Sequence, residues 1–342
     1  MKCLNAPRAA AADSTRGSAL ILALWILLTL ALLIGGFAFE MHVEAGLTSY
    51  ARKRFRADYL AQSGVEWAQA LLARSREIKE DDELTGNETT DALRVPALNL
   101  KNGNAVTGFR LELGDGAVTV DIQPETGRRN VNTLSDEDWE ELLDQAGVPQ
   151  EQWSELIDCF GDWTDDNDFS RLNGAESDDP FYRERGYEVK NAPLDTVDEL
   201  RLIKGFSEAV LFGGPGAREN DPPLRGIAQW LTTWDDGKVN LNTASREVLF
   251  TLGLDEMTVD RVLEKRLGED GEAGTEDDGL KEGDLAALGL DGLKNVTLGE
   301  TRFVRVVSVG ESAGVRGGIW AVLYVGDADA VRAVYWREEP LP

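Results

Sequence analysis

The segment that decides the fold is SALILALWILLTLALLIGGFAF, residues 18–39, which contains 22 residues and no formal charge. A helix of this length spans about 33 Å at about 1.5 Å per residue, which is enough to cross the hydrocarbon core of a bilayer. The head before it carries Lys2, Arg8 and Arg16 against Asp13. By the positive-inside tendency, this charge predicts a single-pass anchor with a cytoplasmic N-terminus and everything after the segment outside.

Past the apolar segment, small and apolar residues recur every three or four positions as far as residue 79. This spacing is typical of a helix with one apolar stripe. The membrane helix is therefore expected to continue as a stalk, giving one helix over 18–79, with Trp67 and the stripe packed against a sheet.

Two groups of strands flank a long middle region. Residues 105–122 predict a β-hairpin around Gly114-Asp115-Gly116. Three later β-rich runs predict an antiparallel meander: 302–310, 318–326 and 330–338. Between these groups the periodicity is helical and strands are scarce. The predicted class is α+β, a membrane and stalk helix packed on an antiparallel sheet, with a large, mostly helical insertion at 126–298.

The composition excludes several functions. The chain has 342 residues with 62 Asp and Glu against 35 Lys and Arg, a formal net charge of −27. So acidic a surface repels phosphate backbones, which disfavours a nucleic-acid partner. One His and two Cys rule out His-rich metal sites, an all-cysteine zinc site and a disulfide framework. Cys159, on an apolar helix face, is expected to be a buried free thiol.

An acidic stretch within the insertion predicts a cation site. Its candidate ligands are Asp162, Asp165, Asp166, Asp168, Glu176 and Asp179. Short oxygen-bearing side chains around a Gly turn suit Ca²⁺, which takes six to eight oxygens and tolerates irregular geometry. Among them Asp165, Asp168 and Glu176 are the first choices. The alternative is a solvated acidic loop that binds no metal.

A second acidic loop alternates carboxylates with Gly over 268–279. Its candidate ligands are Asp270, Glu272, Asp277 and Asp278. The loop could equally be a flexible acidic surface. No sugar-binding aromatic platform or nucleophile motif accompanies these acids, so the chain is predicted not to be an enzyme. An anchored periplasmic hydrolase is kept as an alternative function.

Two segments of the insertion begin alike, at 130–148 and 239–254, each with Asn-x-Asn-Thr before a helix. The Asn or Thr side chain is expected to accept hydrogen bonds from the first turn of that helix. The second segment, continued to Arg266, resembles the helix-hairpin-helix of competence proteins, which binds DNA through backbone N–H groups of a Gly-rich hairpin. Here the hairpin is the acidic Leu254-Asp255-Glu256-Met257. The alternative function is accordingly a type IV pilus minor pilin or a competence-type DNA-uptake protein.

The start of the apolar segment, RGSALIL at 16–22, resembles the class III signal of type IV pilins and type II secretion pseudopilins. The resemblance implies cleavage by prepilin peptidase between Gly17 and Ser18. Most of that family carry Glu at the fifth mature position, where this chain has Leu22. An unpaired charge in hydrocarbon is costly, so a subunit with no neighbour ahead of it has no use for that Glu. This points to the filament tip.

The stretch 156–206, with its Asp-rich loop followed by Lys-Asn-Ala-Pro-Leu-Asp, resembles the general secretion pathway protein K family, the minor tip pseudopilins of type II protein secretion. The resemblance implies a pilin-like fold, calcium in the helical domain, and a subunit that caps or initiates the pseudopilus. The implied partners are I- and J-type minor pseudopilins, the inner-membrane platform and the peptidase. The implied location is the bacterial inner membrane, with a periplasmic head.

The expected organisation is a leader at 1–17, the helix at 18–79, an α/β part at 80–125, the insertion at 126–298 and a closing meander at 299–342.

Overall fold

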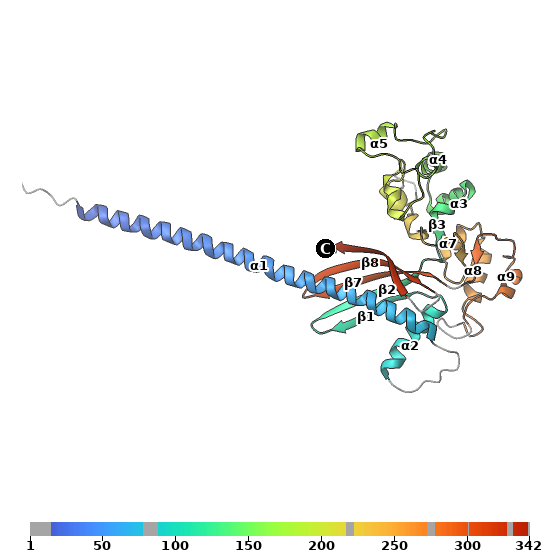
Figure 1. Cartoon of the computed structure of the whole chain (residues 1–342), viewed down its shortest axis with the longest axis horizontal. Coiled ribbons are helices and arrows are strands. Elements are labelled where there is room, and N and C mark those ends of the chain that lie inside the picture. Colours follow the sequence, from blue (N-terminus) through green and yellow to red (C-terminus); the bar gives the residue numbers. More distant parts are fainter. Residues whose placement is uncertain are drawn as a thin grey trace, which may run out of the picture. The chain divides into compact units, whose positions relative to one another are not determined.

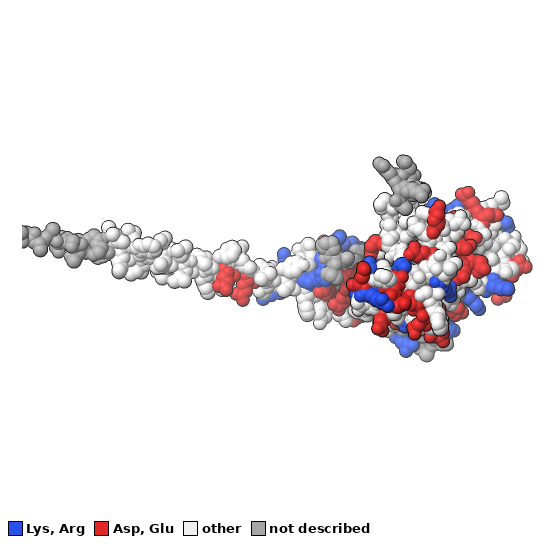
Figure 2. Space-filling view, turned by 90° about the horizontal axis from the view of Figure 1, so that it is seen from above, with Lys and Arg blue, Asp and Glu red and all other residues white. Residues whose placement is uncertain are grey.

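The computed structural model describes residues 15–77, 88–216, 222–271, 278–299, 301–326 and 331–340. The chain divides into two compact units, Met1–Arg56 and Ala57–Pro342. The first helix, α1 (Thr15–Glu77), supplies all of the described part of the first unit. Its portion from Ala19 onward is long and apolar enough to cross a membrane, and its most apolar window has no buried residue. Figure 2 shows that window free of Lys, Arg, Asp and Glu.

An antiparallel sheet forms the framework of the second unit, with strand order β1-β2-β7-β8-β9. The strands are β1 (Val106–Leu113), β2 (Gly116–Pro124), β7 (Phe303–Ser312), β8 (Val315–Val325) and β9 (Val331–Pro340). The predicted hairpin and meander are confirmed. Strand β8 begins three residues earlier than expected, because the turn is a tight Ala313-Gly314 pair with positive φ at both residues.

The end of α1 within the second unit packs on this sheet. Ala61, Val65 and Ala68 are buried in one core with the inward-facing residues of β2, β7 and β8. The approach is close: a Cβ on Gly64 would lie 2.2 Å from the hydroxyl of Ser308, so the helix needs a glycine there. Trp67 stacks on Phe109 with the ring centroids 4.3 Å apart, as the predicted contact between stalk and sheet requires.

A helix that the sequence analysis did not predict, α2 (Glu88–Lys101), lies between α1 and the sheet in sequence. The sequence gives no clear helical pattern here, because residues 80–91 are mostly polar and Pro96 lies inside the helix. Ala97 of this helix is fully buried in the same core as α1 and β2. Tertiary packing, rather than local sequence preference, explains the helix.

The insertion has a hydrophobic core of its own, distinct from that of the sheet. Its described helices are α3 (Asp136–Ala146), α4 (Trp153–Thr164), α5 (Pro180–Arg185), α6 (Glu208–Phe212), α7 (Arg246–Phe250), α8 (Glu256–Lys265) and α9 (Glu282–Leu288). Four 3₁₀ turns join them: η1 (Val131–Thr133), η2 (Gln150–Gln152), η3 (Val197–Leu202) and η4 (Ala228–Trp230). Figure 1 shows α3, α7, α8 and α9 gathered beyond one end of the sheet. The boundaries proposed for the insertion remain a prediction, but the two cores fall on either side of them.

Two pairs of short parallel strands tie the insertion together, β3 (Arg129–Asn130) with β4 (Leu231–Thr232) and β5 (Val239–Asn240) with β6 (Val296–Thr297). Each pair leads into one of the two Asn-x-Asn-Thr motifs. The side chain of Asn132 makes two hydrogen bonds with the backbone of Leu194: its Nδ2 donates to the Leu194 carbonyl at 3.0 Å, and its Oδ1 accepts from the Leu194 N–H at 2.8 Å. The side chain of Asn242 does the same with Leu280: it donates to the Leu280 carbonyl at 3.3 Å and accepts from the Leu280 N–H at 2.7 Å. The insertion therefore repeats one local design twice.

The predicted capping is found in part: Asn130 is the N-cap of η1, but neither motif caps the α-helix that comes after it. In each motif the first Asn accepts from the N–H two residues on and so closes its own turn. Ser135 and Ser245 cap α3 and α7 instead. The second Asn of each motif instead makes hydrogen bonds to a segment distant in sequence. The spacing of residues in the sequence does not show such contacts.

Candidate metal centre

The first acidic loop connects α4 to α5. Asp162 lies in the last turn of α4, Asp165 is the residue that ends it, and Asp179 is the N-cap of α5. Two of the predicted ligands are buried: Asp162 has no exposed surface and Glu176 is 3% exposed. Carboxylates are almost never so buried unless something compensates their charge.

Among the described residues, no cationic side chain pairs with Glu176 to compensate its charge. Neither of its carboxylate oxygens has a hydrogen-bond partner. Burial, together with the charges of Asp162, Asp165 and Asp168, raises the pKa of Glu176 to about 7, and the backbone N–H of Ser177 only partly opposes this rise. Three of the other predicted ligands therefore act electrostatically on Glu176. A cation beside Glu176 would favour its ionised form.

Asp162 organises the loop around itself. The backbone N–H of Arg171 donates to both carboxylate oxygens of Asp162, at 3.0 and 3.2 Å. Burial raises the pKa of Asp162, the Arg171 N–H opposes this, and the charge of Asp165 adds to the rise. Gly174 passes so close that a Cβ there would lie 1.9 Å from Oδ2 of Asp162. The Gly turn noted in the sequence is therefore required by this close approach.

Asn191 was not among the ligands predicted from the sequence. Its Nδ2 donates to Oδ1 of Asp168 at 2.9 Å, while its own Oδ1 is buried without a partner. The backbone of Asn191 has a φ of +49°, a left-handed conformation that Asn tolerates better than most residues. The available signal was the place of Asn191 before Ala-Pro in the Lys-Asn-Ala-Pro-Leu-Asp run that carries the family resemblance.

Two of the predicted ligands, Asp179 and Asp166, do not lie beside Glu176 with free oxygens in a buried position. Asp179 accepts from the Phe181 N–H at 2.8 Å and pairs with Lys204 at 3.0 Å, so both of its oxygens are engaged. Burial tends to raise the pKa of Asp179, but these two contacts lower it overall. Asp166 is exposed on the outside of the loop. Asp179 thus has a structural role, as helix cap and ion-pair partner, that the sequence did not suggest.

In the part of the chain that the structure describes, no group of three or more His, Cys, Asp or Glu side chains is arranged to hold a metal ion by itself. The unpartnered buried oxygens of this region belong instead to Glu176 and to the amide of Asn191. Ca²⁺ accepts such a mixture of carboxylate and amide oxygens in flexible geometry. The donor types fit calcium, provided that Asp162, Asp165 and Asp168 close in on the ion.

The second acidic loop is described only at its ends. Asp270 lies in the turn after α8, and Asp278 follows the gap, while Glu272 and Asp277 lie outside the described residues. Asp278 accepts from Nδ2 of Asn104 at 3.3 Å. The metal site proposed for this loop stays a prediction.

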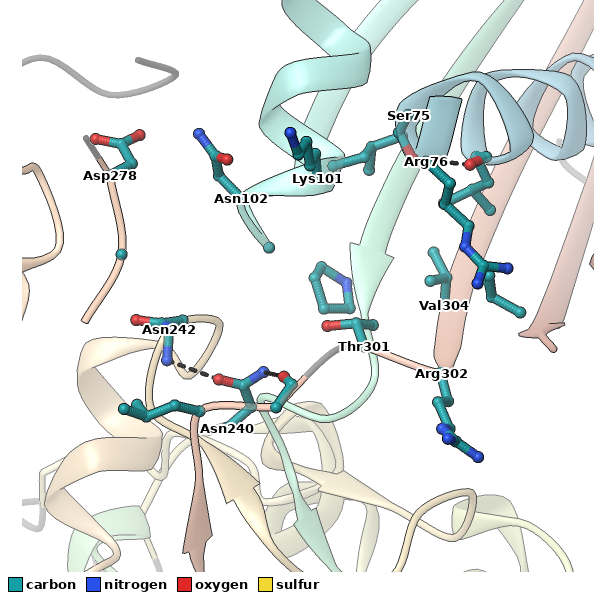
Figure 3. Close-up of a pocket in the computed structure, with 18 of the residues that line it drawn as sticks. Ser75, Arg76, Lys101, Asn102, Asn240, Asn242, Asp278, Thr301, Arg302 and Val304 are labelled. Atoms are coloured by element: carbon teal, nitrogen blue, oxygen red, sulfur yellow. Dashed lines mark hydrogen bonds between the residues drawn. The ribbon is translucent and has the colours of Figure 1, made fainter. Parts of the chain in front are cut away.

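Asp278 also lines a pocket of about 490 Å³ beside the second Asn-x-Asn-Thr motif. Figure 3 shows Asn240 and Asn242 joined on one side of it, with Lys101, Asn102 and Asp278 on the other. The hydrogen bonds of Asn240 and Asn242 go to the backbone of the surrounding loops. The amide side chains of Asn240 and Asn242 therefore fix the loops that line the pocket.

The helix-hairpin-helix likeness does not extend to a phosphate site. The carboxylate of Asp255 accepts from the N–H of Thr258 at 2.7 Å and so covers the start of α8. An anion placed there would meet this carboxylate instead of free N–H groups. The DNA-uptake alternative is not favoured.

Comparison with known proteins finds the same family that the sequence resembles. Residues 113–212, which include the first acidic loop and Asn191, match the family model described as type II secretion system (T2SS), protein K. The predicted resemblance to this family is confirmed. It is 26% identical over 209 residues to the type II secretion system protein K of Klebsiella pneumoniae, covering 57% of this chain and 59% of that protein.

A second relative, the putative type II secretion system protein K of Escherichia coli (strain K12), is 26% identical over 207 residues, covering 58% of this chain and 60% of that protein. The chain thus spans about three fifths of the length of the curated relatives it matches.

The fold is that of a chain in the crystal structure of the GspK-GspI-GspJ complex from the enterotoxigenic Escherichia coli type 2 secretion system. The two superpose with a TM-score of 0.54 at 14% sequence identity, covering 81% of this chain and 98% of that one. This likeness confirms the predicted α+β class, with its long apolar N-terminal helix, antiparallel sheet and additional helices.

Proposed function

We propose that this chain is a non-enzymatic minor pseudopilin that caps or initiates the pseudopilus of the type II secretion system. The observation that carries the proposal is the match of residues 113–212 to the protein K family. The bulky insertion would obstruct the stacking of another subunit ahead of this one. In the first unit, α1 exposes a continuous apolar surface suited to packing against neighbouring helices, where close fit rather than the hydrophobic effect drives association in lipid.

The proposed partners are I- and J-type minor pseudopilins. Support comes from the fold shared with a chain of the GspK-GspI-GspJ complex. The test is co-expression of the full chain with I- and J-type minor pseudopilins from the same bacterium, followed by detergent extraction and size-exclusion chromatography. A stable ternary complex supports the proposal. Elution of the chain alone, with correctly inserted I and J subunits present, contradicts it.

The proposed location is the bacterial inner membrane, with the N-terminus cytoplasmic, the head periplasmic and the secretion platform as neighbour. Prepilin peptidase would cut between Gly17 and Ser18 and leave the apolar helix on the mature chain. The residues supporting this are the basic residue and Gly directly before the apolar run. Mass spectrometry of the chain from cells with and without the peptidase tests it: the expected mature N-terminus is Ser18, and an unchanged mass in both strains would refute cleavage.

The proposed cofactor is Ca²⁺ in the first acidic loop. Glu176 and Asn191 would bind it with their unpartnered buried oxygens, joined by Asp162, Asp165 and Asp168. A bound divalent cation would neutralise the clustered carboxylates and fix the loop. Calorimetric titration of Ca²⁺ into the EDTA-treated full chain tests the site. Binding should be lost in Glu176→Gln and kept in the exposed control Glu184→Gln.

A further inference from the structure

The acidic loop carries two large apolar side chains that the fold does not use. Phe169 is 82% exposed and Leu172 is 96% exposed, the two highest values among the exposed large apolar side chains of the described residues. They lie three positions apart on the same loop. Single exposed apolar residues are ordinary, but two nearly bare ones on one short loop form a feature that needs an explanation.

The backbone that carries them is held firmly. The N–H of Phe169 donates to the side chain of Asn167 at 2.9 Å. On either side of Leu172, the N–H groups of Arg171 and Asn173 donate to carboxylates of α4, each at 3.0 Å. The two apolar side chains are therefore displayed on an ordered loop. Binding through preorganised groups loses little conformational entropy, which favours an interaction surface.

The charge around the pair restricts what can cover it. Residues 162–179 contain seven Asp and Glu and one Arg, a net charge of 1 − 7 = −6. One bound Ca²⁺ would leave this segment negative. A second copy of this chain would bring the same charge, and anionic lipid headgroups would be repelled as well. A protein surface rimmed with Lys and Arg would be attracted.

We propose that Phe169 and Leu172 anchor a protein partner that presents an apolar helix face bordered by Lys and Arg. The two side chains would pack against that face, and the exposed carboxylate of Asp166, which the proposed calcium site does not use, would face its basic border. Apolar anchors supply most of the energy of such an interface, while the surrounding charges set the rate and the choice of partner. This proposal concerns a surface that the proposed function leaves unassigned.

The test uses the full chain in nanodiscs and a fluorescein-labelled amphipathic helical peptide of Leu and Lys as probe. Two matched peptides replace every Lys by Glu or every Leu by Ser. Fluorescence anisotropy measures binding to the wild type, to Phe169→Ser/Leu172→Ser and to Met257→Ser, which removes another exposed apolar side chain, on α8. Both changes are at exposed positions, so the melting temperature should be unchanged.

The Leu/Lys peptide should bind the wild type, lose at least about tenfold in affinity for the double variant, and lose little for Met257→Ser. The Leu/Glu and Ser/Lys peptides should bind much more weakly. Equal affinity for wild type and double variant would overturn the proposal, as would equal binding of the Leu/Glu peptide. Co-sedimentation of the nanodiscs with phosphatidylglycerol vesicles, lost in the double variant, would assign the surface to lipid and also overturn it.

Discussion

The buried carboxylate of Glu176 predicts how the stability of the calcium-free chain depends on pH. Its pKa is raised from 4.5 to about 7 by burial and by its acidic neighbours. The folded chain therefore holds this proton more tightly than the unfolded chain does, and the free energy of unfolding falls as pH rises from about 4.5 to about 7. The full change corresponds to about 3.5 kcal/mol, at about 1.4 kcal/mol per pKa unit.

The magnitude is large enough to measure. At roughly 2–4 °C per kcal/mol for a domain of this size, the melting temperature should fall by up to roughly 7–14 °C across that range. The assay is thermal unfolding of the full chain in detergent with EDTA, followed by circular dichroism at several pH values. Glu176→Gln cannot ionise, so its melting temperature should fall much less, and saturating Ca²⁺ should remove most of the fall from the wild type.

The control is Glu184→Gln, an exposed position in α5 that should follow the wild type. If Glu176→Gln and the wild type lost stability in parallel as the pH rises, the unpaired charge of Glu176 would not be the cause, and the argument for a cation beside it would fail.

Three further changes follow from the packing. Gly174→Ala should cost about 1–3 kcal/mol and weaken Ca²⁺ binding, because its Cβ would lie 1.9 Å from an oxygen of Asp162; urea unfolding and calorimetry measure the two effects. Gly310→Ala should destabilise the head by a similar amount, since its Cβ would lie 2.0 Å from a carbonyl oxygen of α1, whereas Gly292→Ala, with no atom within 4 Å, should leave the urea midpoint unchanged. Burial raises the pKa of the Cys159 thiol to about 12, so in a Cys3→Ser chain maleimide should label Cys159 only after denaturant is added; fast labelling of that variant in its native state would contradict the burial of Cys159.

The regular parts of the fold were predictable because their patterns are local. Alternation over β1 and β2, and the Gly-Asp turn between them, specify a hairpin without any distant residue. The stripe of α1 likewise predicted its packing on the sheet. Helix α2 was missed because it is held by Ala97 in a core built from distant elements. Local sequence carries little of that information.

The candidate site was predictable in composition but not in detail. Clustered carboxylates pointed to the loop, yet their order in the sequence does not distinguish the buried Glu176 from the exposed Asp166. Asp179 is taken up by α5 and Lys204, and Asn191 reaches the cluster from a separate segment. Both facts depend on how the chain turns back between α4 and η3, which residue spacing does not determine.

The central claim, that this chain is a tip pseudopilin of type II secretion, is tested most directly by the fate of secreted enzymes in the bacterium that encodes it. The gene is deleted in frame, and the activity of a type II secreted enzyme is measured in the medium and in the periplasm. The account predicts that the enzyme accumulates in the periplasm and that the wild-type chain on a plasmid restores its release. Normal release from the deletion strain would contradict the claim.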